Sequence, residues 1–122
     1  MPYKRTFSTI TNYRFAAMFI HHVFFWLKEG LSQADIQKFE TGVRSLLTIE
    51  SVRFGDVGKP AATDRPIIER SYSYSLLAVF DDERGHDAYQ VPASEIHKRF
   101  VDECQHLWER VLIYDSQSEA KI

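Results

Sequence analysis

Cysteine is nearly absent from this sequence, since Cys104 is the only one among 122 residues. A single cysteine excludes an internal disulfide, and nothing else in the sequence indicates an oxidising compartment. An excess of charge of one sign is also missing. The 15 basic and 17 acidic residues give a net charge of −2, and no basic block occurs. This balance argues against nucleic acid or an anionic membrane as the main partner.

Long hydrophobic runs are missing as well. The longest, residues 15–27, is interrupted by His21 and His22 and is too short to span a bilayer. Polar residues at 6–12 stand where a signal peptide would be apolar. The sequence therefore predicts a cytoplasmic protein with one domain at 19–116. Residues 1–18 are expected to be an N-terminal extension and residues 117–122 a polar tail.

Clear secondary-structure patterns begin at Phe19. Residues 19–28 predict a strand covered on both sides, because aromatic and β-branched residues occupy both of its alternating faces. Ser32 and Asp35 have the spacing of a capping box. Apolar residues at helical spacing follow them and predict a helix: Ile36, Phe39, Val43, Leu46 and Leu47. Further strands are expected at 50–57 and 71–80, with a long loop between them.

The last third of the chain predicts two helices and a strand. A short helix is expected to end before Pro92, and Ser94 can cap the next helix. The apolar stripe of that last helix is Ile96, Phe100, Val101, Cys104, Leu107, Trp108 and Val111. A short strand at 112–115 completes the order β-α-β-β-α-β. This order is typical of a ferredoxin-like α+β unit with its helices on one face of the sheet.

The other face of such a sheet would carry no helices. Phe24, Trp26, Tyr74 and Leu76 are expected to lie on it. Burying one such side chain stabilises a protein by roughly 1.5–3 kcal/mol, so leaving four of them in water loses about 6–12 kcal/mol of stabilising free energy. That loss rivals the whole stability of a small domain, so a second copy is expected to cover this face. The sequence therefore predicts a homodimer in which two ferredoxin-like units form a dimeric α+β barrel.

Several short motifs occur in one order along the chain: His21-His22-Val23-Phe24, Asp87-Ala88-Tyr89-Gln90, His97-Lys98-Arg99-Phe100-Val101, Leu107-Trp108 and Val111-Leu112-Ile113-Tyr114-Asp115. Together they resemble the stress-responsive A/B barrel family (dimeric α+β barrels) over roughly residues 19–116. The resemblance implies a homodimer whose sheets enclose a pocket in each subunit.

One characterised plant member of that family cyclises a linear polyketide by aldol condensation without a cofactor. Tyr89 and His97 resemble its catalytic tyrosine and histidine, and Tyr74 stands where it has a second histidine. Other positions resemble its pocket residues: His22, Phe24 and Trp26 in the first strand, and Trp108, Val111 and Ile113 near the C-terminus. With Tyr74 and Leu76, these residues are expected to line one cavity for a small, mostly apolar ligand that carries a polar group.

The chemistry of Tyr89 and His97 suits a carbonyl substrate. A neutral imidazole could remove a proton next to the carbonyl, and a phenol could stabilise the resulting enolate. Aldol cyclisation or isomerisation would follow, and no cofactor is expected. The alternatives are a stress-related binding protein without turnover and a cofactor-free monooxygenase. In the simplest reading, His97 and Tyr89 only pack in the fold.

No metal site is predicted from the sequence. His21 and His22 are neighbours in a strand, so they point to opposite faces and cannot bind one ion together. His86 is expected to be exposed, and His21 to be a buried histidine beneath a helix. Cys104 lies within an apolar stripe, where a buried, unreactive thiol is expected.

Overall fold

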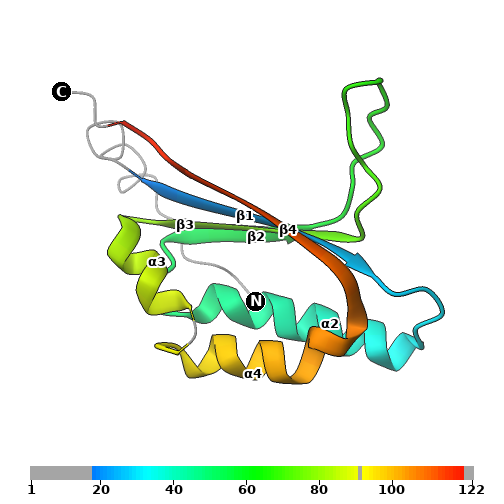
Figure 1. Cartoon of the computed structure of the whole chain (residues 1–122), viewed down its shortest axis with the longest axis horizontal. Helices are drawn as coiled ribbons and strands as arrows, with labels where there is room; N and C mark the ends of the chain where they lie inside the picture. Colours follow the sequence, from blue (N-terminus) through cyan, green and yellow to red (C-terminus); the bar gives the residue numbers. More distant parts are fainter. Residues whose placement is uncertain (1–17, 91, 120–122) are drawn as a thin grey trace.

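Figure 1 shows the computed structural model, which describes residues 18–90 and 92–119. A four-stranded antiparallel sheet has the strand order β2-β3-β1-β4. Its strands are β1 (Phe19–Leu27), β2 (Phe54–Gly58), β3 (Tyr74–Phe80) and β4 (Trp108–Gln117). Helices α2 (Gln33–Ser45), α3 (Glu83–Tyr89) and α4 (Glu95–Cys104) all lie on one side of this sheet. The predicted ferredoxin-like α+β fold is confirmed.

Strand β1 shows most clearly which side of the sheet is covered. Phe19, His21, Val23 and Phe25 are buried beneath the helices, whereas the residues between them are only half-buried. Alternation of this kind is expected where one face packs on a core and the other does not. The aromatic residues on the second face therefore lie on the open side of the sheet.

Helix α2 begins where the sequence predicts. The Ser32 hydroxyl accepts a hydrogen bond from the backbone N–H of Asp35 at 3.1 Å, which satisfies one of the free donors at the helix start. Gly42 then allows α4 to approach closely, since a Cβ there would lie 3.0 Å from Cys104 Sγ and from the Phe100 ring. The Cys104 thiol is buried at this helix contact, as predicted.

Helix α4 ends earlier than its apolar stripe suggests. It stops at Cys104, a 3₁₀ turn covers Gln105–Leu107, and Trp108 already begins β4. The expectations that Trp108 and Val111 are helical and that the last strand spans only 112–115 are therefore wrong. Aromatic and β-branched residues fit a pleated sheet better than a helix, and pairing with β1 outweighs the helical spacing.

The open face of the sheet differs in part from the prediction. Phe24 and Trp26 do lie on it, but Tyr74 and Leu76 are buried beneath the helices. Tyr74 pairs with Phe25 in the register of β1 and β3, so both side chains point to the covered side. Leu112 and Tyr114 of β4 take their place on the open face, opposite Phe24 and His22 of β1.

A long loop at 59–73 joins β2 to β3 and projects from the open side of the sheet, away from the helices (Figure 1). Ile67 in this loop is 82% exposed. Among residues 18–90 and 92–119, no helix is long and apolar enough to cross a membrane. The predicted extension lies outside the described residues, apart from Met18.

Candidate functional site

A pocket of about 150 Å³ lies on the covered side of the sheet, near the edge strand β4. The helices do not fully cover this edge. Val111 and Ile113 point to the helix side, yet they remain 41% and 47% exposed. Most of the wall is apolar and comes from the sheet and α4, and the polar side chains that line it include His21, Tyr89 and His97. These three residues are the candidate functional groups.

Tyr89 is fixed by the short helix α3. The side chain of Asp82 accepts a hydrogen bond from the N–H of Gly85 at 3.0 Å and caps the helix start. His86 and Tyr89, three positions apart, then share the face that packs on the sheet, and both are buried. Burial raises the pKa of the Tyr89 phenol, and the nearby negative charge of Asp115 raises it further. Tyr89 is therefore protonated at neutral pH and can donate a hydrogen bond.

His97 is fixed by the first turn of α4. Its backbone N–H donates to the hydroxyl of Ser94, the predicted cap residue, at 3.2 Å. The imidazole is half-buried and lies 5.0 Å from the Tyr89 ring, nearly perpendicular to it. Burial lowers the pKa of His97, and the neighbouring His21 lowers it further. Its Nδ1 is buried without a hydrogen-bond partner among the described residues. A neutral imidazole that lines a pocket is suited to accept a proton or bind a ligand.

His21 is the third polar group, and the sequence did not predict a functional role for it. It is 3% exposed, and its Nδ1 lies 2.6 Å from Oδ1 of Asp115, its directly opposite partner in β4. Burial lowers the pKa of His21, against the opposing effect of the Asp115 carboxylate. In the neutral ring Nδ1–H donates to the carboxylate, which fixes the ring and leaves Nε2 as an acceptor. The ring lies 5.4 Å from Tyr89, so His21 completes the polar end of the pocket.

The family model of the Stress responsive A/B Barrel Domain matches residues 19–118. The chain belongs to this family. No curated protein sequence shows a significant match to the chain.

Solved structures share the fold at low sequence identity. A Dabb family protein from Mesorhizobium loti is 22% identical, with a TM-score of 0.64 over 82% of this chain and 95% of that one. A dimeric ferredoxin-like protein of unknown function from Thermobifida fusca is 16% identical, with a TM-score of 0.65 over 83% and 91%. The hydroxynitrile lyase of Passiflora edulis is 16% identical, with a TM-score of 0.67 over 86% and 96%. Similarity at this level establishes the fold of this A/B barrel chain and leaves its activity open.

The residues expected to line the A/B barrel pocket divide between the two faces of the sheet. Those found along the pocket with Tyr89 and His97 are Leu76, Trp108, Val111 and Ile113. The prediction that His22, Phe24 and Trp26 line the same cavity is wrong, because their side chains point to the open face. Adjacent strand residues alternate between faces, so His21 occupies the place expected for His22.

Tyr74 is also misplaced by the prediction. It lies on the covered side, but it does not line the pocket that contains Tyr89 and His97. Its hydroxyl donates a hydrogen bond to the carboxylate of Glu40 in α2. Burial and this carboxylate raise the pKa of Tyr74 to about 12. Tyr74 therefore joins β3 to α2, away from the candidate functional groups.

His86 differs from the prediction as well, because it is 6% exposed rather than on the surface. It lies with His21 and Asp115 in a group whose potential metal-ligating atoms are all within 4.8 Å of one another. The spacing of these three residues in the sequence gives no indication of this cluster. Only the packing of α3 on β1 brings His86 to His21.

Proposed function

We propose that this A/B barrel protein binds a small, mostly apolar carbonyl compound and performs cofactor-independent acid–base chemistry on it. One observation carries the proposal: the Tyr89 phenol and the His97 imidazole lie 5.0 Å apart, ring centre to ring centre, and line the same pocket. An apolar wall with a few polar groups at one end is typical of small-molecule sites.

The size of the pocket limits the ligand. Sites for drug-sized ligands usually have about 300–1,000 Å³, and an engineered protein cavity of about 150 Å³ holds benzene. The pocket of about 150 Å³ therefore suits a ligand with the bulk of one six-membered ring. A long polyketide chain would not fit without movement of α3 or α4. This argues for isomerisation or a similar reaction of a small ketone over the cyclisation of an extended chain.

The reaction needs a base and a hydrogen-bond donor. The neutral His97 imidazole takes a proton from the carbon next to the carbonyl, and the C–H electron pair moves to form the enolate. The Tyr89 hydroxyl donates a hydrogen bond to the developing oxyanion, which stabilises it most where water is excluded. Imidazolium then returns the proton to carbon, so no external oxidant, reductant or cofactor takes part. His21, held by Asp115, supports Tyr89 through its ring contact.

We further propose that the chain is a homodimer joined through the open face of the sheet. Phe24 is the centre of an aromatic group there, with ring centres of His22, Tyr72 and Tyr114 at 4.4, 4.9 and 6.1 Å. A contiguous aromatic face of this kind is unfavourable in water and is typical of an interface. The Thermobifida fusca protein is dimeric, which supports a dimer but does not identify the face that forms it. We also propose a cytoplasmic location, because a single cysteine cannot form the internal disulfide that is typical of oxidising compartments.

Hydrogen–deuterium exchange tests the chemistry without knowledge of the natural substrate. Cyclohexanone has one six-membered ring, and its α-protons are lost from the NMR spectrum when a base catalyses exchange in D2O. We expect the protein to accelerate this exchange, and His97→Ala or Tyr89→Phe to reduce the acceleration by about a hundredfold or more. His106→Ala, an exposed histidine outside the pocket, is the matched control. If cyclohexanone binds but its α-protons do not exchange faster, the protein is a binding protein and the proposed catalysis is refuted. If His97→Ala leaves the accelerated exchange unchanged, His97 is not the base.

A further inference from the structure

Three potential metal ligands that lie far apart in the sequence meet beside β1: His21, His86 and Asp115. One potential ligand atom from each lies within 4.8 Å of the other two. His21 and Asp115 are directly opposite across β1 and β4, and His86 comes from α3. Two imidazoles and one carboxylate form a donor set that binds divalent transition-metal ions in three-ligand sites, with water in the remaining position.

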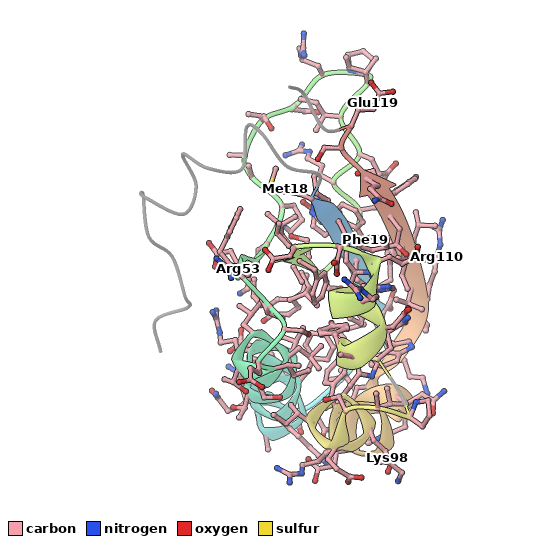
Figure 2. The ribbon with its side chains drawn as sticks, turned by 90° about the vertical axis from the view of Figure 1, so that its left-hand side faces the viewer. Met18, Phe19, Arg53, Lys98, Arg110 and Glu119 are labelled. Carbon is pink, nitrogen blue, oxygen red and sulfur yellow. The ribbon has the colours of Figure 1, made fainter. Side chains whose placement is uncertain are left out.

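His86 provides an independent indication of a ligand. Its side chain is almost fully buried, yet its Nε2 has no hydrogen-bond partner among the described residues. The His86 ring is held in place by stacking on the Phe19 ring, with the ring centres 4.4 Å apart, and its centre lies 4.6 Å from that of His21. Figure 2 shows Phe19 near α3. A buried ring nitrogen without a hydrogen-bond partner destabilises the fold, because the nitrogen has lost its hydrogen bond to water. An ion bound to that nitrogen would remove this destabilising effect.

We propose that His21, His86 and Asp115 bind a divalent transition-metal ion of the Zn²⁺ and Co²⁺ class. This site shares His21 with the pocket that holds Tyr89 and His97, but it goes beyond the proposed function because His86 and Asp115 do not line that pocket. Paired imidazoles favour these ions over Ca²⁺ and Mg²⁺, which prefer oxygen ligands. The sequence-based expectation of no metal site rested on the opposite directions of His21 and His22 and on an exposed His86, and the structure removes the second premise because His86 is buried.

The geometry of the contact between His21 and Asp115 must change for the cluster to accept an ion. His21 Nδ1 and Asp115 Oδ1 are 2.6 Å apart. Two ligands at about 2.0–2.1 Å from a tetrahedral ion lie roughly 3.3 Å apart. If these two atoms are the ligands, the ion takes the place of the proton on Nδ1, that proton moves to Nε2 of the neutral His21 ring, and the carboxylate moves by about 0.7 Å. The Asp115 side chain is 38% exposed at the sheet edge, so it has room to move and offers a route from solvent.

Metal titration of the untagged, metal-free full chain tests this site directly. We expect calorimetry to show one Zn²⁺ bound per chain with a micromolar or lower dissociation constant. Co²⁺ should give the visible absorption of a low-symmetry nitrogen and oxygen site. Loss of an outer-shell partner alone typically weakens metal binding 10–100-fold, so His86→Ala, which removes a ligand, should weaken Zn²⁺ binding by about a hundredfold or more. His106→Ala is the matched control and should bind Zn²⁺ as the unchanged protein does.

Asp115→Asn is a second ligand variant, which tests the site even if His86→Ala does not fold. The substitution keeps the shape of a partly exposed side chain but removes its charge, and circular dichroism of the metal-free protein reports whether the fold persists. Zn²⁺ binding by folded Asp115→Asn should also fall by at least tenfold. The proposal is overturned if the unchanged chain binds neither ion stoichiometrically. It is equally overturned if folded Asp115→Asn binds Zn²⁺ normally, or if His106→Ala abolishes binding.

Discussion

Phe24→Asp is the substitution that most strongly tests the proposed dimer. Phe24 lies at the centre of the aromatic group on the open face and is half-buried within one chain. Burying one such side chain is worth about 1.5–3 kcal/mol, and a symmetric dimer loses this contribution twice, or about 3–6 kcal/mol. At about 1.4 kcal/mol for each factor of ten, the dissociation constant should rise roughly 10²- to 10⁴-fold. Because one chain already covers part of Phe24, the lower end of this range is expected.

Sedimentation velocity over a concentration series measures this effect. At micromolar concentration we expect a dimer for the unchanged chain and a folded monomer for Phe24→Asp, with the fold verified by circular dichroism. Gln37→Asp places the same charge at an exposed position of α2 and should leave the dimer intact. A stable, well-folded monomer of the unchanged chain would refute the reasoning. A dimer unaffected by Phe24→Asp would place the interface elsewhere.

Three further predictions concern stability. Deleting residues 1–17 should change the melting temperature by only a few degrees, and a large fall would show that this segment contributes to the fold. Gly55→Ala should destabilise the protein by about 1–3 kcal/mol in urea unfolding, because a Cβ there would overlap the carbonyl oxygen of Leu77. Gly58→Ala should have a much smaller effect, because a Cβ there would lie 3.7 Å from its nearest neighbour, Ser75 Oγ. Equal losses of stability in the two variants would contradict this packing. Burial lowers the pKa of His97 below its ordinary 6.5. Above pH 6.5 the neutral His97 therefore makes its full contribution to the free energy of unfolding. This contribution should be lost as the pH falls through the lowered pKa, because the unfolded chain takes up the proton more readily than the folded protein does. His97→Gln should flatten this fall in melting curves, and an unchanged pH dependence would contradict it.

The fold could be predicted because its signals are local. The Ser32 cap and the apolar spacing after it define α2, and the aromatic density of residues 19–28 defines β1. The faces of β1 could not be assigned in the same way. Phe19, Val23 and Phe25 are no more apolar than the residues between them, so alternation alone does not indicate which set meets the helices. The resemblance to the family's pocket residues indicates His22 instead of His21, and nothing in the local pattern of β1 corrects this one-residue shift, which changes the face of the sheet.

The remaining errors come from contacts between distant segments. The apolar spacing through Trp108 and Val111 fits a helix, and only pairing with β1 makes this segment a strand. His86 carries no signal of burial in its own segment, Glu83–Tyr89, which is otherwise polar or small apart from Tyr89. Its position depends on the packing of α3 against Phe19 and His21. Such positions depend on the tertiary arrangement and could not be read from a single sequence.

A crystal structure of the protein soaked with cyclohexanone tests the central claim most directly. We expect the ring to occupy the pocket on the covered side of the sheet, with its carbonyl oxygen about 2.7–2.8 Å from the Tyr89 hydroxyl. The α-carbon should face the His97 imidazole, at about the distance needed for proton transfer. Cyclohexanone bound on the open face beside Phe24 and Trp26, or in the pocket with its carbonyl turned away from Tyr89, would contradict the proposed site.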